Sequence, residues 1–287
     1  MNRWLTLAAA TILATLVVLS LAAPALEILL GHNPEEVDLG ARFESPSFSH
    51  PLGTDDLGRD VFLRLLYGGR VSLTVGLLAA LAAASVGTLI GLLSGYFRGR
   101  LDALLMRLTD GVIALPLLPL LIILAAVDFS KLGLGALVQS ESASLYRIVL
   151  IITLVGWTSV ARLVRGATLS LLGRDFVRAA FAMGARAPRI MFVHILPNAV
   201  SPIIVATTLA VGNVILFESV LSFLGLGIQP PVPSWGNMLT NAQEVIGSAP
   251  LLAVWPGLLI LLTVASCNLL GDALQHALDP RARLLKR

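Results

Sequence analysis

Residues 170–198 have the sequence SLLGRDFVRAAFAMGARAPRIMFVHILPN, a long polar insert between two strongly hydrophobic runs. Such an insert is expected outside a bilayer. Apolar side chains recur in it at the three-to-four-residue spacing of one helix face: Phe176, Ala179, Ala180 and Met183. Four arginines accompany them: Arg174, Arg178, Arg186 and Arg189. The insert therefore predicts a basic helix whose half-apolar face docks on a partner.

The composition of the whole chain predicts a membrane protein. Of its 287 residues, 56% are hydrophobic and 13% charged, and the mean hydropathy is +0.88. Soluble chains have about 25% charged residues, and apolar stretches of about 20 residues span a bilayer. The net charge of +3 does not indicate nucleic-acid binding, because no basic run with interleaved aromatic residues stands on a polar domain. Membrane lipid headgroups are the better partner for the basic residues.

Six apolar runs predict an all-α polytopic membrane protein with six transmembrane helices. The runs are Trp4–Leu30, Val71–Tyr96, Gly111–Val127, Ile148–Val164, Ala199–Leu221 and Leu251–Leu270. A cleaved signal peptide is the alternative for the first run, but that run exceeds the usual apolar core of about 7–15 residues, which favours a retained helix. Pro116 and Pro119 predict a kink in the third run. Residues 97–110 are expected as a polar loop, and residues 60–67 as the start of a surface helix.

Small residues form a strict four-residue repeat in the second run. They are Ala79, Ala83, Gly87, Gly91 and Gly95. One face of this helix is thus lined by small side chains, which allow two helices to approach closely in lipid. The alternative is that small residues are merely tolerated there.

Lys and Arg are unevenly distributed between the predicted loops. If both termini are cytoplasmic, 14 of the 20 basic residues lie on the inner side and most acidic residues lie outside. Short cytoplasmic loops carry the excess of Lys and Arg, so this orientation is expected. It places the insert 170–198 in the cytoplasm, where its helix meets a cytosolic partner.

The sequence displays no catalytic set. Lys131 and Lys286 are its only lysines, and neither stands in a G-x-x-x-x-G-K-[ST] motif, so any use of ATP requires a separate subunit. The four histidines are scattered and H-E-x-x-H does not occur, so no metal site and no metalloprotease is predicted. The single cysteine, Cys267, lies in an apolar run and is expected as a buried thiol.

Glu218, close to the outer end of the fifth run, is the notable acidic residue within an apolar run. Ionisable residues inside a membrane are functional candidates by default. Glu218 is therefore a candidate for binding a coupling ion, or a structural group that reaches water or pairs with Arg70 or Arg147. An ion-coupled transporter is expected to contain inverted repeats and an acid near the bilayer midplane; no clear repeat is found, and Glu218 is peripheral.

The segment RAAFAMG followed by ILPN resembles the cytoplasmic signature loop of binding-protein-dependent ABC importer permeases. That loop has the pattern Glu-Ala-Ala, three residues, Gly, nine residues, and then Ile-x-Leu-Pro. The matching positions are Ala179, Ala180, Gly184, Leu196 and Pro197. Arg178 replaces the acid of the signature and His194 replaces its isoleucine.

Four further segments are similar to the peptide/nickel branch of this family, and specifically to its "C" subunit type. They are HPLGTDDLGRDVFLRLLYGGRVSL (50–73), GYFRGRLDALLMRLTD (95–110), SFLGLGIQPPVPSWGNML (222–239) and NLLGDALQHALDPR (268–281). His194 is usual in this branch. The resemblance thus extends from about residue 50 to residue 281.

The resemblance implies the type I ABC importer permease fold in the bacterial plasma (inner) membrane, with both termini cytoplasmic. Residues 1–68 would form the first transmembrane helix and an external acidic segment, 69–272 the permease domain with its coupling loop 170–198, and 273–287 a cytoplasmic basic tail. The chain would have no enzyme activity and bind no cofactor, since ATP and Mg²⁺ belong to two separate ATPase subunits. The remaining protein partners would be a related "B"-type permease subunit and an external solute-binding protein.

The resemblance also implies roles for particular residues. The expected ATPase-coupling residues are Arg178, Ala179, Ala180, Gly184, Leu196 and Pro197. The segments HPLGTDDLGRD and LGLGIQPPVPSWG are expected to form the surface on which the binding protein lands. The expected contact residues there are Gly53, Asp55, Gly58, Arg59, Asp60, Pro233 and Trp235, and a membrane-interface anchor is the alternative for the tryptophan. Di- and oligopeptides are the expected substrates, with nickel or another small solute as the alternative.

Overall fold

The computed structural model describes residues 3–127, 143–240 and 245–278. Regular structure in these ranges is helical, apart from one isolated β-bridge between Thr54 and Asp60. The loop containing Lys131 lies outside the described residues. So does residue 279 onward of the predicted basic tail 273–287, whose residues 273–278 are the end of a helix.

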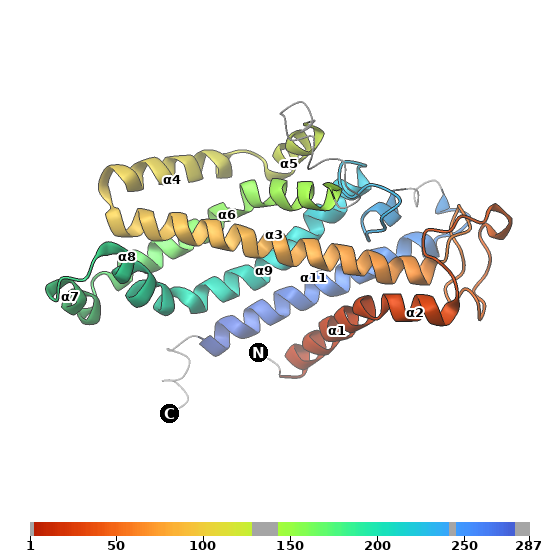
Figure 1. Cartoon of the computed structure of the whole chain (residues 1–287), viewed down its shortest axis with the longest axis horizontal. Helices are drawn as coiled ribbons and strands as arrows, with labels where there is room; N and C mark the ends of the chain where they lie inside the picture. The colour runs from red at the N-terminus through yellow and green to blue at the C-terminus, as the bar shows by residue number, and fades with distance from the viewer. Residues whose placement is uncertain (1–2, 128–142, 241–244, 279–287) are drawn as a thin grey trace.

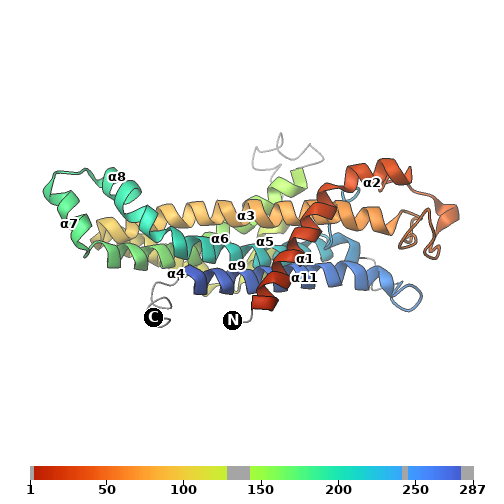
Figure 2. The same ribbon diagram turned by 90° about the horizontal axis from the view of Figure 1, so that it is seen from below.

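The long helices form one elongated bundle (Figure 1). They are α1 (Arg3–Leu21), α3 (Val61–Phe97), α6 (Ala143–Leu171), α9 (Leu196–Phe223) and α11 (Leu251–Leu278). Helix α3 extends along most of the bundle, and α6 and α9 pack against it. The view from below shows that α1 crosses α11 obliquely and is followed by the short helix α2 (Ala23–Leu30) (Figure 2).

Within the described ranges, five helical stretches are long and apolar enough to cross a membrane, and α4 (Gly99–Ala114) with α5 (Leu117–Ala126) makes a sixth if this bent pair is one span. This confirms the predicted all-helical, multi-pass fold class. The first predicted run is divided at Ala22 into α1 and α2. The third is bent by 90° between α4 and α5, where Leu115 is extended before Pro116, as expected for the residue preceding a proline.

Two local predictions were wrong. Residues 97–110 are not a polar loop, because most of them belong to α4. Residues 60–67 do not start a separate surface helix. They are the buried first turns of α3, which has 37 residues and begins after Asp60, whose carboxylate accepts the N–H of Leu63 at 2.7 Å. A capping aspartate satisfies an N–H group that would otherwise lack a partner.

The small-residue repeat of α3 faces α6. All five of its positions are buried. A Cβ atom added at Gly87 would lie 2.5 Å from the carbonyl oxygen of Trp157, and one added at Gly91 would lie 2.6 Å from that of Ala161. The two backbones therefore approach so closely that there is no room for a larger side chain at these positions.

Replacement of Gly91 by leucine is expected to lower the free energy of unfolding by about 3 kcal/mol, since the new side chain forces α3 and α6 apart. The measurement is thermal unfolding of the purified chain in detergent. Gly166→Leu is the matched control, because an added Cβ at this glycine of α6 meets no atom within 4 Å. Equal melting temperatures for the two variants would contradict the close α3–α6 contact.

Candidate functional site

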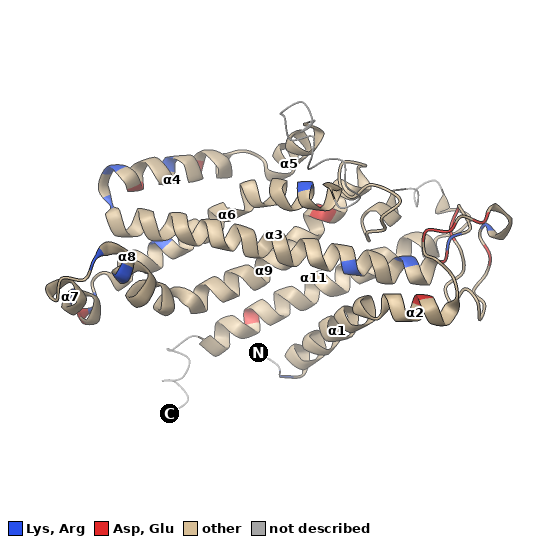
Figure 3. Cartoon of the chain, viewed as in Figure 1, with Lys and Arg blue, Asp and Glu red and all other residues tan. Residues whose placement is uncertain are grey.

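The two ends of the bundle differ in charge (Figure 3). Arginines of α4 and of the segment around α7 (Asp175–Ala182) gather at one end. Most of the acidic residues of segment 31–60 gather at the other. The insert 170–198 thus lies at the basic end of the molecule.

The insert forms a short helical protrusion between two long helices (Figure 1). Helix α6 ends at Leu171, α7 follows, and α8 (Ala187–Arg189) leads through the π-helical turn η4 (Ile190–Ile195) into α9. Because α6 and α9 are both membrane-spanning candidates, a displacement of α7 acts on two long helices at once. We call residues 170–198 the coupling segment.

Helix α7 has a buried and an exposed face. Val177 and Ala180 are buried and belong to an apolar cluster with Ile190 and Ile195 of η4. The exposed residues of α7, together with the residue that follows it, are Asp175, Phe176, Arg178, Ala179, Phe181, Ala182 and Met183. Ala180 therefore does not share the exposed face on which the sequence pattern had placed it. It packs against other residues of the same chain, so its small side chain serves the attachment of α7 to η4.

Gly184 ends α7. Its φ is 77°, the left-handed region that glycine adopts without strain. The N–H of Gly184 donates to the carbonyl of Phe181, and the N–H of Ala185 to that of Ala180, both at 3.0 Å. This is the Schellman pattern of a helix C-terminus. The remaining two signature residues lie at the start of α9, where Leu196 is half-buried and Pro197 exposed in the first turn, a position that proline tolerates.

Two ion pairs attach α4 to α6 at the basic end. The guanidinium of Arg165 donates to both carboxylate oxygens of Asp102, at 2.6 and 2.7 Å. Arg162 pairs with Asp110 at 2.5 Å. Ser94 of α3 also donates to Asp102. Bidentate contacts hold geometry more firmly than single ones, so α4 is connected to the helix that leads into the coupling segment.

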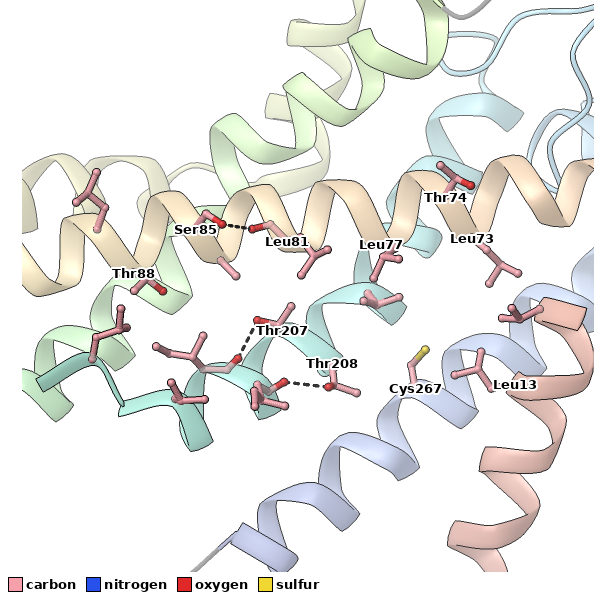
Figure 4. A pocket seen from close by; sticks show the side chains of 18 of the residues that line it. Leu13, Leu73, Thr74, Leu77, Leu81, Ser85, Thr88, Thr207, Thr208 and Cys267 are labelled. Carbon is pink, nitrogen blue, oxygen red and sulfur yellow. Dashed lines mark hydrogen bonds between the residues drawn. The ribbon is translucent and has the colours of Figure 1, made fainter. Parts of the chain in front are cut away.

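A groove of about 850 Å³ lies between α1, α3, α9 and α11 (Figure 4). Its walls are largely leucine, isoleucine and valine. The hydroxyls of Ser85, Thr207 and Thr208 donate to carbonyl groups of their own helices, at 2.8 to 2.9 Å, so they leave the groove apolar. Arg70 is the charged residue of its lining. The groove suits an apolar occupant, and its lining offers no ligand set for a metal. Elsewhere in the described ranges, no group of three or more His, Cys, Asp or Glu residues could hold a metal ion.

The residues expected to contact a binding protein in segment 50–60 are mostly buried. Asp55 accepts the guanidinium of Arg59 at 2.8 Å, and Asp60 contacts His50 at 2.9 Å. Gly53 and Gly58 have φ values of 76° and 75°, and an added Cβ would collide with backbone oxygen at each. These residues hold the fold of the segment and do not themselves present a surface.

Pro233 and Trp235 are also buried, and Trp235 is only 1% exposed. Its indole N–H donates to the carbonyl of Leu65 at 2.9 Å, and its ring lies where a Cβ on Gly69 would be. The tryptophan is therefore neither an exposed contact nor an anchor in the lipid interface. It is a core residue that packs on α3.

Glu218 is fully buried in α9. Its carboxylate accepts the hydroxyls of Ser72 at 2.9 Å and Ser222 at 2.7 Å. The expected pairing with Arg70 or Arg147 is wrong for the described residues, since no ion pair of Glu218 occurs there and Arg147 donates instead to the carbonyl of Leu226. Sequence reasoning missed both serines; only the spacing of four residues between Glu218 and Ser222 indicated one of them.

The model of a protein family described as "Binding-protein-dependent transport system inner membrane component" matches residues 87–284. The chain belongs to this family. It is thus a multi-pass permease subunit of the bacterial inner membrane, and the family predicted from the signature loop is confirmed. The match includes the coupling segment and the whole of α4, α6, α9 and α11.

Named relatives of this permease are permease proteins of dipeptide, di/tripeptide and glutathione transport systems. The dipeptide transport system permease protein DppC of Alkalihalophilus pseudofirmus is 39% identical over 95% of this chain and 84% of its own length. The di/tripeptide transport system permease protein DppC of Pseudomonas aeruginosa is 43% identical over 81% of this chain and 72% of its own. The glutathione transport system permease protein GsiD of Pectobacterium atrosepticum is 41% identical over 84% and 75%.

Thiol labelling tests the two faces of α7. In a Cys267→Ala background, Met183→Cys is expected to react with a maleimide roughly tenfold faster than Val177→Cys, because Met183 is 80% exposed and Val177 is 0% exposed. The measurement is the labelling rate of the purified permease in detergent. Similar rates at both positions would show that α7 does not pack on η4 as described.

Proposed function

We propose that this permease forms half of the translocation pathway of an ATP-driven importer for di- or oligopeptides and couples that pathway to separate ATPase subunits. The observation that supports this most directly is the exposed face of α7, which projects from the end of the bundle on a segment continuous with α6 and α9. This face combines exposed apolar side chains such as Met183 with the charged Asp175 and Arg178, and exposed apolar surface rimmed by polar residues suits a partner protein. A related "B"-type permease subunit forms the other half of the pathway.

In this proposal the basic end of the bundle faces the cytoplasm, and both termini are on the cytoplasmic side of the membrane. The concentration of arginines around α4 and the coupling segment supports this orientation, because cytoplasmic loops carry the excess of basic residues. The acidic segment 31–60 then lies outside, on the side from which a solute-binding protein delivers its cargo.

In this mechanism, each permease docks the exposed face of α7 on one of two ATPase subunits. Closure of the ATPases around ATP and Mg²⁺ displaces α7 as a rigid body. The buried Val177 and Ala180 transmit this displacement to η4, and the chain itself transmits it to α6 and α9. The Arg165–Asp102 and Arg162–Asp110 ion pairs hold α4 against α6, so α4 moves when α6 moves. The bend at Pro116, which follows α4, then moves together with the coupling segment.

Arg178 lies on the exposed face where the family signature has an acid. We infer that the groove of this permease's own ATPase presents a carboxylate or a carbonyl group at this position. A guanidinium needs such an acceptor when it is removed from water. Arg178 would then restrict which ATPase the permease accepts.

Peptides are the proposed substrates because the relatives that align over most of the chain are named for dipeptides, di/tripeptides and glutathione. Nickel is the alternative within the same branch. The groove of Figure 4, which is largely apolar, suits peptide side chains or a partner helix better than a hydrated metal ion.

Reconstituted uptake tests the proposed energy source. The complete complex in vesicles is expected to import a labelled dipeptide only with ATP inside, and an imposed proton or sodium gradient without ATP is expected to give no uptake. The measurement is accumulated label over time with each energy source. Uptake driven by an ion gradient alone would favour a secondary transporter and contradict this function.

Two neighbouring alanines distinguish docking from folding. Ala179→Glu adds a charge to the exposed face and is expected to reduce ATP-driven uptake at least tenfold while the amount of membrane-inserted protein stays near that of wild type. Ala180→Glu buries the same charge and is expected to lower the amount of folded protein. The measurements are uptake and permease yield in membranes. Wild-type uptake by the Ala179 variant would exclude this face from ATPase docking.

A further inference from the structure

Residues 224–236, between α9 and the 3₁₀ turn η5 (Asn237–Leu239), form a loop that we call the proline loop. It lies directly on α9. A Cβ atom added at Gly236 would lie 2.6 Å from the Cα of Ser219. The loop backbone and the helix therefore touch, and glycine is required at the point of contact.

Two chains of hydrogen bonds join the proline loop to one carboxyl group. The N–H of Trp235 donates to the hydroxyl oxygen of Ser72 at 3.2 Å, and Ser72 donates to Glu218 Oε2 at 2.9 Å. The N–H of Ile228 donates to the hydroxyl oxygen of Ser222 at 3.0 Å, and Ser222 donates to Glu218 Oε1 at 2.7 Å. Each carboxyl oxygen thus ends one chain that begins at the loop backbone.

Two further side-chain contacts hold the proline loop. Arg147 of α6 donates to the carbonyl of Leu226 at 3.1 Å, and the indole of Trp235 donates to the carbonyl of Leu65 in α3 at 2.9 Å. The loop is therefore attached to three long helices. Glu218 lies at the centre of this arrangement, since it is the group on which both serine chains end.

The chemistry of the arrangement requires an acceptor with two oxygens. Both serine hydroxyls receive a backbone N–H and pass their own hydrogen to Glu218. A carboxylate accepts at both oxygens and donates nothing, whereas a glutamine amide has one oxygen and an NH₂ group that donates. A glutamine at this position would place its NH₂ group against one of the serine hydroxyls. The hydrogen of that hydroxyl would then lose its acceptor, and a buried donor without a partner is costly.

The opposite edge of the proline loop is open to solvent. Its exposed residues are Leu224, Gly225, Gln229, Pro230 and Pro231. The side-chain amide of Gln229 donates back to the carbonyls of Gly225 at 2.9 Å and Gly227 at 3.2 Å. This edge combines apolar side chains with a polar amide, and hydrogen bonds within the loop hold its shape. Such a mixed surface suits a contact with another protein.

The 3₁₀ turn η5, which follows the proline loop, adjoins the acidic segment. A recess of about 50 Å³ is lined by Asp55, Arg59 and Arg64 on one side and by Asn237 and Met238 of η5 on the other. The element into which the proline loop leads thus lies beside the acidic segment, toward the end of the bundle opposite the coupling segment (Figure 1).

We propose that Glu218 is a positioning residue that holds the exposed edge of the proline loop, residues 224–231, in the shape that receives the solute-binding protein. This inference rests on the proposed function. It assigns the contact to exposed residues in place of the buried Pro233 and Trp235, and it gives the buried glutamate a role at the side of the permease that faces the substrate.

The test uses the complete complex in vesicles with its purified binding protein. The concentration of binding protein that half-saturates the stimulated ATPase activity is expected to rise about tenfold in Glu218→Gln, while the maximal stimulated rate is retained. A substitution that only destabilised the fold would lower the maximal rate in proportion to the protein lost. Leu224→Asp, which leaves the serine chains intact, is expected to raise the half-saturating concentration as well.

Glu27→Gln is the matched control, because Glu27 of α2 accepts a hydroxyl hydrogen from Tyr67 and, among the described residues, makes no hydrogen bond to the proline loop. The binding-protein concentration that half-saturates ATPase stimulation in this variant is expected to equal that of wild type. If Glu218→Gln is not recovered in membranes, Ser72→Ala and Ser222→Ala each remove one chain and test the same claim. Unchanged half-saturation in these variants, in a complex whose wild type imports with ATP, would overturn the role of Glu218. A wild-type complex that shows no ATP-driven import would instead refute the proposed function.

Discussion

The close contact between α3 and α6 is the constraint on which the rest of the structure depends. Glycines at four-residue intervals remove every side chain that would separate the two backbones. Lipid tails are as apolar as the helix surfaces, so the hydrophobic effect does not drive two helices together within a bilayer. Close van der Waals packing is therefore a main source of helix association. The same two helices also contact the functional segments at both ends of the bundle. Helix α6 leads into the coupling segment, and α3 provides Ser72, which connects Glu218 to the proline loop.

The packed pair α3 and α6 contacts both the coupling segment and the proline loop, so in the proposed function it can connect their movements. At one end, α6 continues toward α7 and holds α4 through Arg162 and Arg165. At the other, Arg147 of the same helix contacts the proline loop. In the proposed cycle, a displacement of α7 therefore reaches the opposite end of the permease without a separate relay, since packed helices move as bodies and deform little.

Much of the fold and part of the site could be predicted because they depend on local sequence. The apolar runs, the four-residue repeat from Ala79 and the kink before Pro116 each need only the periodicity or chemistry of one segment. The loop predicted at 97–110 was wrong for a different reason: α4 is polar enough to suggest a loop, and the arginines that pair with its Asp102 and Asp110 lie on α6. A charge that is paired across helices cannot be distinguished from a solvated charge in the sequence.

The sequence by itself determined the membrane class, the family and the position of the coupling segment, because hydropathy and motif spacing are properties of neighbouring residues. Only the tertiary structure decided that Ala179 faces outward and Ala180 inward, since η4 covers one side of α7. It also decided that Trp235 is a core residue and that Glu218 accepts from Ser72, 146 positions away. Such contacts depend on how distant helices pack, and no local pattern encodes them.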